Sequence, residues 1–333
     1  MDRNSIQNKD TCTICDSHTY VIRNTVSSLD KTTTWENEST MKLLGLDNVE
    51  SQIRFCFKCF HAFRFPLYDE SIIYGERGFK FRKETFERYN PGQEYGGRNY
   101  YQHSWFIENK RNLEYLTHLL GHIIENYPSI ERKECLKILD FGGGDGYLGE
   151  TISLISNKVV GGPCRTYCYD YHEWDKDSKS PYFNYISTED MTKESPYDIV
   201  IVSHVLEHTS SPTKLLQKLV AYLNEDSIIV VAVPYEQISV LSPLSVFMNY
   251  HQQMFSVSSL YEVMRRCNFK NIYINVYDTY YRGKSRINNI VATANISETP
   301  QRRQYRHYFY DIYKLQNILA KEVIKRFIKR INL

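Results

Sequence analysis

Short apolar runs alternate with helical segments through the middle of the chain. Continuous apolar runs predict buried strands at 136–141, 166–170, 198–203 and 227–233. Apolar residues at helical spacing predict helices at about 108–127, 147–157, 212–224 and 257–267. Strands and helices that alternate in this way indicate a mostly parallel sheet with helices on both faces.

Two later segments, 272–277 and 290–295, alternate between apolar and polar positions and predict a closing antiparallel pair of strands. The predicted fold class is therefore α/β, with a Rossmann-like sheet. A hydrophobic content of 42% excludes a wholly disordered chain.

Net charge is uneven along the chain. The whole chain is +2, but residues 301–333 carry nine Lys or Arg against two acidic residues, so this tail is +7 and the remainder is −5. A mildly acidic body argues against a broad nucleic-acid surface. Residues 306–332 predict a basic amphipathic helix, for which three roles stay open: docking on its own domain or self-association, which we favour, membrane contact, and nucleic-acid binding.

The chain shows no targeting or membrane-spanning segment. Its first ten residues, MDRNSIQNKD, lack the apolar core of a signal peptide, and the longest apolar run, 228–233, is too short to cross a bilayer. We therefore expect a cytoplasmic protein, with a peripheral position at the inner membrane face as the alternative that the basic helix leaves open.

Two C-x-x-C pairs lie near the N-terminus. Four thiolates in two such pairs can surround one tetrahedral Zn²⁺ ion, and a reducing compartment disfavours disulfides. The alternative is that one or both pairs are incidental. The predicted structural zinc ligands are Cys12, Cys15, Cys56 and Cys59. We expect the polar segment between the pairs, which includes Glu36 and Asn37, to form strands and turns of a ribbon.

The patterns divide the chain into four parts. A connecting or lid region, rich in Tyr, Gly, Arg and Asn, is expected to form short helices and loops between the zinc ribbon and the α/β domain. The expected boundaries are 1–65 for the zinc-binding ribbon, 66–107 for the connecting region, 108–297 for the α/β domain and 298–333 for the basic helix.

A glycine-rich loop follows the first strand of the α/β domain, in the stretch ILDFGGGDGYLGE. Its glycines fit the G-x-G-x-x-G pattern of dinucleotide sites, but S-adenosylmethionine sites use the same geometry. Two acidic residues, Asp140 and Asp145, would repel a pyrophosphate and favour the ammonium group of a methionine. Asp170 ends the next strand, where a carboxylate can accept hydrogen bonds from the ribose hydroxyls of either ligand.

These motifs, with the stretch DIVIVSHVLEHTSSPTKLLQKLVAYLNEDSIIVVAVP, resemble those of the class I S-adenosylmethionine-dependent methyltransferases over 108–297. The resemblance implies a seven-stranded methyltransferase sheet and a bound S-adenosylmethionine. It places the adenine end near Ser187 to Asp190. The cofactor-binding residues that it implies are Asp140, Gly142, Gly144, Gly146 and Asp170.

An N-terminal zinc module joined to such a domain is similar to sugar methyltransferases that act on nucleotide-linked sugars or surface polysaccharides. Members that methylate carbon have a further C-terminal domain and a YHEH-like stretch with the catalytic histidine. Here residues 250–253 read YHQQ and the chain ends soon afterwards. Methylation of a sugar hydroxyl is therefore the favoured expectation.

A hydroxyl acceptor benefits from a general base, and neutral imidazole is available near pH 7. The candidates are His251, His208 and His204, although His208 and Glu207 can equally fix the turn before the helix at 212. The H-x-x-E-H spelling at 204–208 suits a zinc protease only on a helix, and here it follows a strand. Some O-methyltransferases have E-x-x-E-H and bind Mg²⁺ here; His204 replaces the first Glu, which disfavours that ion.

The favoured function is an S-adenosylmethionine-dependent methyltransferase of a sugar or glycan, with S-adenosylmethionine and structural Zn²⁺ as cofactors. The alternatives are a methyltransferase of another small molecule or of RNA, a non-catalytic adaptor that keeps the fold, and, more remotely, an oxidoreductase. Expected partners are the sugar substrate and a membrane or protein surface at the C-terminal helix.

Overall fold

The computed structural model describes residues 10–26, 35–44, 50–92, 121, 123, 135–144, 146, 148–149, 164–171, 183–235, 251–281 and 285–297. Four expected features therefore lie wholly or largely outside the described residues. These are most of the helices at 108–127 and 147–157, Asp145 in the glycine loop, and the basic C-terminal region at 298–333. The role of the C-terminal helix stays a prediction.

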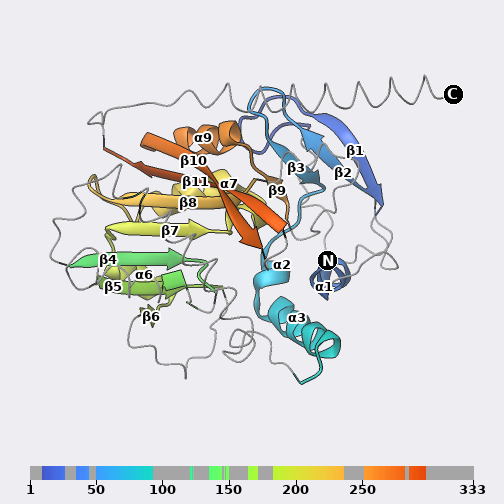
Figure 1. Ribbon diagram of the computed structural model, residues 1–333, viewed down its shortest axis with the longest axis horizontal. Helices are drawn as coiled ribbons and strands as arrows, with labels where there is room; N and C mark the ends of the chain where they lie inside the picture. The colour runs from blue at the N-terminus through green and yellow to red at the C-terminus, as the bar shows by residue number, and fades with distance from the viewer. Residues whose placement is uncertain are drawn as a thin grey trace.

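The larger of two sheets has seven strands in the order β10-β11-β8-β7-β4-β5-β6 (Figure 1). The five strands from β8 to β6 are parallel, whereas β11 runs antiparallel to β8 and to β10. The predicted closing pair is confirmed, and the sheet is mixed. The strands are β4 (Leu136–Phe141), β5 (Cys164–Tyr169), β6 (Phe183–Tyr185), β7 (Ile199–Ser203), β8 (Ile228–Pro234), β10 (Lys270–Tyr281) and β11 (Ser285–Asn295).

The central strands are buried on both faces, because successive side chains point to opposite sides of the sheet. On one face, Leu139, Val200 and Val231 pack in a cluster with apolar residues of three helices. On the other face, Ile138 and Val230 pack in a second cluster with Ile123. The three helices are α6 (Thr188–Glu194), α7 (Pro212–Val220) and α9 (Val257–Arg266).

A smaller sheet has the strand order β1-β2-β3-β9 (Figure 1). Its first three strands come from the N-terminal region, and the fourth, β9, comes from a distant part of the chain directly before α9. The two parts of the protein are therefore joined by strand pairing. The strands are β1 (Tyr20–Val26), β2 (Glu50–Phe55), β3 (Ala62–Phe65) and β9 (Gln253–Met254).

The expectation of strands and turns between the two cysteine pairs is wrong in part. Helix α1 (Trp35–Leu44) occupies part of this segment and contains Glu36 and Asn37. An ion pair of 2.7 Å between Glu38 and Lys42, one helical turn apart, supports the helix. Three successive threonines at 32–34 favour a strand by their composition, which explains the expectation for the whole segment.

The described part of the connecting region forms helices α2 (Ser71–Tyr74) and α3 (Glu76–Tyr89). Helix α3 is tied to α1 because Arg88 donates a 2.7 Å hydrogen bond to Glu38 and the hydroxyl of Tyr89 donates to the same carboxylate. The hydrogen bonds from Lys42, Tyr89 and Arg88 outweigh burial and lower the pKa of Glu38 to about 2. Among the described helices, none has the length and apolar character needed to cross a membrane.

Candidate functional site

The glycine loop follows β4 and depends on backbone conformations that favour glycine. Gly142, Gly144 and Gly146 have φ angles of 74°, 58° and 76°, in the left-handed region. The N–H group of Gly142 donates a 2.7 Å hydrogen bond to the carbonyl of Tyr169 at the end of β5. The loop therefore lies at the carboxyl ends of adjacent parallel strands, where ligands bind in sheets of this kind.

Gly144 is held by Asp170, directly after β5, and by Tyr185, the last residue of β6. Its N–H group donates a 2.9 Å hydrogen bond to Oδ2 of Asp170, and its carbonyl accepts a 3.1 Å bond from the hydroxyl of Tyr185. Asp170 is thus beside the loop, as its predicted role requires. Tyr185 was missed because the three-residue strand β6 has no recognisable sequence pattern.

Asp140 lies beneath the loop and is only 1% exposed. A Cβ atom on Gly143 would lie 2.7 Å from its carboxyl carbon, so the carboxylate packs directly against the loop backbone. In this position Asp140 supports the backbone of the loop. The expected adenine-binding segment has a structural use as well, since Ser187 caps α6 by accepting a 3.1 Å hydrogen bond from the backbone of Asp190.

The three candidate histidines are brought together around a buried carboxylate. Glu207, 1% exposed, lies in the short 3₁₀ helix η4 (Leu206–His208) that follows β7. Its Oε1 atom is 3.2 Å from Nδ1 of His204 and 3.8 Å from Nε2 of His208. The rings of His208 and His251 meet edge to face, with centroids 4.8 Å apart. We refer to His204, Glu207, His208 and His251 as the histidine cluster.

The electrostatic balance of this cluster favours an ionised Glu207. Burial alone would raise its pKa, but the contact with His204 and the positive charge that His208, His204 and His251 can carry outweigh burial and lower the pKa to about 2. The structure therefore places a buried carboxylate where it can orient imidazole rings. In the sequence, Glu207 was considered as a residue that fixes a turn and as part of a possible metal-binding motif, but not as a carboxylate that orients histidines.

The histidine cluster is a direct neighbour of the glycine loop. Val205, between His204 and η4, packs so closely on Gly142 that a Cβ atom there would lie 2.5 Å from Cγ2 of the valine. The backbone of His204 has a φ angle of 55°, which turns the chain sharply at the end of β7. Loop and cluster are thus placed side by side at one edge of the sheet.

Comparison with known families agrees with this arrangement. A family model described as "Methyltransferase domain" matches residues 100–274, just over half of the chain. The chain belongs to this methyltransferase family. No curated protein matches it.

Solved structures with a similar fold include two described as S-adenosylmethionine-dependent methyltransferases. The one from Archaeoglobus fulgidus is 17% identical, with a TM-score of 0.36 over 54% of this chain and 93% of that protein. The one from Methanosarcina mazei is 14% identical, with a TM-score of 0.38 over 53% of this chain and 98% of that protein. The [4+2]-cyclase SpnF is 11% identical, with a TM-score of 0.39 over 54% of this chain and 80% of that protein.

Two glutamines join the methyltransferase sheet to the N-terminal sheet. Gln252 donates two hydrogen bonds to η4: its N–H group donates to the carbonyl of Glu207 at 2.7 Å, and its Nε2 atom donates to the carbonyl of His208 at 2.8 Å. Gln253 donates through Nε2 to the carbonyl of Thr209 at 2.9 Å. The segment that carries His251 is therefore bonded along the length of η4.

The other ends of the same glutamines reach the N-terminal region. Oε1 of Gln253 lies 2.9 Å from Nε2 of the buried His61 and accepts a 3.0 Å hydrogen bond from Thr13, next to Cys12. The carbonyl of Gln252 accepts a 2.8 Å bond from the backbone of Arg64 in β3. The two glutamines of YHQQ thus help to connect the cysteine pairs with the methyltransferase domain.

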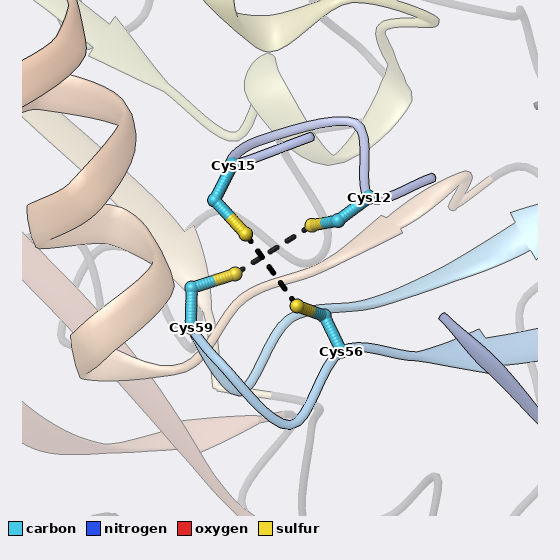
Figure 2. Close-up of side chains that lie close together, drawn as sticks. All are labelled: Cys12, Cys15, Cys56 and Cys59. Atoms are coloured by element: carbon cyan, nitrogen blue, oxygen red, sulfur yellow. Dashed lines mark hydrogen bonds between the residues drawn. The ribbon is translucent and has the colours of Figure 1, made fainter. Parts of the chain in front are cut away.

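The four predicted metal ligands converge in the structure. Figure 2 shows their thiol groups pointing toward one another, with distances of 3.5 Å between Sγ of Cys12 and Cys59 and between Sγ of Cys15 and Cys56. Tetrahedral zinc with Zn–S bonds of about 2.3 Å would place the sulfurs about 3.8 Å apart. The four buried cysteines therefore fit a metal ion.

We expect Gly143→Ala to weaken cofactor binding and lower the thermal stability of the methyltransferase domain. Its Cβ atom would lie 2.7 Å from the carboxylate of Asp140 and from Sγ of Cys168, and overpacking of this kind typically costs about 1–3 kcal/mol. Calorimetry and ligand titration measure the two effects. Gly121→Ala is the matched control, because a Cβ atom there meets nothing within 4 Å; equal stability and affinity in both variants would refute the close packing.

Proposed function

We propose that this methyltransferase-domain protein transfers the methyl group of S-adenosylmethionine to a hydroxyl oxygen of a sugar, in a nucleotide-sugar or in a capsular or surface glycan. The contact between Gly142 and Val205 carries the proposal, because it joins the glycine loop to the histidine cluster. The sugar is supported by the cysteine module in front of the methyltransferase domain, a combination similar to that of sugar methyltransferases.

The glycine loop and Asp170 would bind the cofactor. Asp170 stands at the end of β5, and besides its bond to Gly144 a carboxylate there can accept hydrogen bonds from ribose hydroxyls. The glycines allow the loop backbone to approach the methionine part closely. Bound S-adenosylmethionine supplies an already activated methyl group, so alignment and exclusion of water are the main tasks of the protein.

His204 is the best-placed general base of the cluster. Its Nδ1 atom faces the carboxylate of Glu207 at 3.2 Å, which holds the ring so that Nε2 is the nitrogen that accepts a proton from the acceptor hydroxyl. Its side chain is 36% exposed, against 17% for that of His208, and His251 is 7% exposed as a residue. His204 would take the proton of the acceptor hydroxyl as that oxygen receives the methyl group of the bound cofactor, which would leave as S-adenosylhomocysteine.

We also propose that Cys12, Cys15, Cys56 and Cys59 bind one structural Zn²⁺ ion. Four sulfurs this close together cannot all carry a negative charge without a cation: hydrogen bonds with its neighbours, first Cys15, and burial raise the pKa of the Cys12 thiol far above its ordinary value, whereas hydrogen bonds with Cys12 lower the pKa of Cys15 and of Cys56. A divalent cation removes this conflict by binding the thiolates directly. The N–H group of Ile14, which donates to Sγ of Cys12 at 3.4 Å, supports a thiolate there.

The test is transfer of a labelled methyl group from S-adenosylmethionine to a panel of nucleotide-sugars and glycans, with the modified atom identified by NMR. We expect a methyl ether on a sugar oxygen. His204→Gln should lower turnover by about 10²–10⁴-fold, the usual contribution of a general base, with cofactor affinity unchanged.

Other products would change the assignment. A new C–C bond would replace O-methylation by C-methylation, and methylation of RNA with a steep salt dependence would replace the sugar by a nucleic acid. Cofactor binding without turnover across the panel would favour a non-catalytic adaptor. His18→Gln is the control for His204→Gln, because His18 packs on Tyr20 in the N-terminal region.

A further inference from the structure

Three side chains of the histidine cluster converge from two segments. One ligand atom from each of Glu207, His208 and His251 can be chosen so that all lie within 4.8 Å of one another. The two segments are fixed to each other, because the backbone and side chain of Gln252 bond the carbonyls of Glu207 and His208. The convergence is therefore set by the backbone and not by one mobile side chain.

The carboxylate at the centre of this group lacks the hydrogen bonds that its burial demands. Among the described residues, Nδ1 of His204 approaches Oε1 of Glu207 at 3.2 Å without the alignment of a hydrogen bond, and neither oxygen has another donor, although the residue is 1% exposed. Burying an ionised carboxylate without such bonds costs several kcal/mol. A positive charge at this point would offset that cost.

A proton and a metal ion are the two ways to supply the charge. A proton on one imidazole can form a hydrogen bond between that ring nitrogen and one carboxylate oxygen. A metal cation can bind all three side chains at once. Metal bonds of about 2.0–2.2 Å to nitrogen and oxygen put neighbouring ligand atoms about 3–3.5 Å apart. The 3.8 Å between Oε1 of Glu207 and Nε2 of His208 is close to that spacing, and small side-chain rotations would close the rest.

We propose that Glu207, His208 and His251 bind a divalent transition-metal ion that holds the acceptor hydroxyl during methyl transfer. Two imidazoles and one carboxylate suit Zn²⁺, Mn²⁺, Co²⁺ or Fe²⁺, whereas Mg²⁺ and Ca²⁺ favour oxygen ligands. Three protein ligands leave open positions for an oxygen of the acceptor. The role in transfer rests on the proposed function, and His204 remains the proton acceptor.

The metal site is tested by titrating Mn²⁺ into the full chain loaded with one equivalent of Zn²⁺, which the four thiolates bind first, and following free Mn²⁺ by electron paramagnetic resonance. The cysteine site is then filled, and its thiolates are poor ligands for Mn²⁺. We expect one bound equivalent. Glu207→Gln and His251→Asn should each weaken binding by at least about tenfold, since even changes beyond the ligands cost about 10–100-fold.

The visible absorption spectrum of bound Co²⁺ distinguishes the cysteine site from the site at Glu207, His208 and His251. Co²⁺ in the cysteine site gives intense thiolate absorption, whereas Co²⁺ on imidazoles and a carboxylate gives weak visible bands without it. Glu225→Gln, an exposed carboxylate on the turn after α7, is the matched control and should bind Mn²⁺ as the wild type does. Unchanged thermal unfolding and cofactor binding verify that each variant is folded.

Absence of Mn²⁺ and Co²⁺ binding at the histidine cluster, or binding that Glu207→Gln and His251→Asn leave unchanged in folded protein, would overturn the metal site. Full methyl transfer by protein with Zn²⁺ only at its cysteines would overturn it as well while leaving the proposed function intact. Binding of Mn²⁺ that depends on both residues, without methyl transfer to any sugar, would instead keep the site and reject the function.

Discussion

Replacing Asp170 by alanine is expected to abolish measurable binding of S-adenosylmethionine. The change removes the acceptor for the N–H group of Gly144, which lies 2.9 Å away, and the proposed acceptor for the ribose hydroxyls. Hydrogen bonds to a charged group are each worth about 1.5–3 kcal/mol. A loss of two amounts to about 3 kcal/mol or more, which is a decrease in affinity of at least about 100-fold.

Asp170→Asn distinguishes the loss of the hydrogen bond to Gly144 from the loss of the negative charge beside the ribose. The amide oxygen of asparagine can still accept from Gly144, so the loop should keep its shape, while the charge that favours the ribose is lost. We therefore expect an affinity between those of the wild type and Asp170→Ala. Fluorescence titration measures all three, with the exposed Asp226→Ala as the control. An Asp170→Ala affinity within threefold of the wild type would place the cofactor elsewhere.

Cys56→Ser is expected to release zinc, unfold the N-terminal sheet and abolish methyl transfer. Structural zinc sites contribute about 10–16 kcal/mol of apparent binding free energy in small domains, so the loss should be large. The four cysteines share a buried cluster with Leu260 and Val263 of α9, and Arg266 of the same helix donates a 3.0 Å bond to the carbonyl of Cys15. The damage should therefore reach the methyltransferase domain.

Gln253 explains why transfer should fail while cofactor binding survives. Once the N-terminal sheet unfolds, Gln253 loses Thr13 and His61, and β9 loses its pairing with β3. His251, two residues earlier, then loses its fixed position at the histidine cluster, whereas the glycine loop remains on the larger sheet. Gln253→Leu, with zinc retained, should likewise lower turnover more than cofactor affinity.

Metal analysis, calorimetry and methyl-transfer assays check these results. Cys135→Ser is the matched control, because Cys135 is exposed and outside the cysteine cluster. Its zinc content and activity should equal those of the wild type. Full zinc content in Cys56→Ser, or full activity in a zinc-free protein, would contradict the structural role of the four cysteines.

The larger sheet could be predicted because most of its strands are recognisable from short continuous stretches of sequence. β7 and β8 are continuous apolar runs, and every residue of β8 is buried. The short β6 and the helix α1 could not be predicted in the same way: three residues make no periodic pattern, and a threonine run before α1 favours a strand.

The candidate site was predictable only where its residues are neighbours in sequence. His204, Glu207 and His208 lie within one turn after β7, so their proximity follows from the motif. The roles of Gln252 and Gln253 depend on the pairing of β3 with β9, which joins positions as far apart as His61 and Gln253, 192 residues away. Local sequence patterns do not predict which distant strands pair with each other.

The central claim is that the glycine loop binds S-adenosylmethionine and not a dinucleotide. Isothermal titration of the full, zinc-loaded chain with S-adenosylmethionine and, separately, with NAD⁺ tests it most directly. We predict one bound equivalent of S-adenosylmethionine, lost in Asp170→Ala, and no heat of binding with NAD⁺. Binding of NAD⁺ that depends on Asp170, or no binding of S-adenosylmethionine by the folded wild type, would contradict the account.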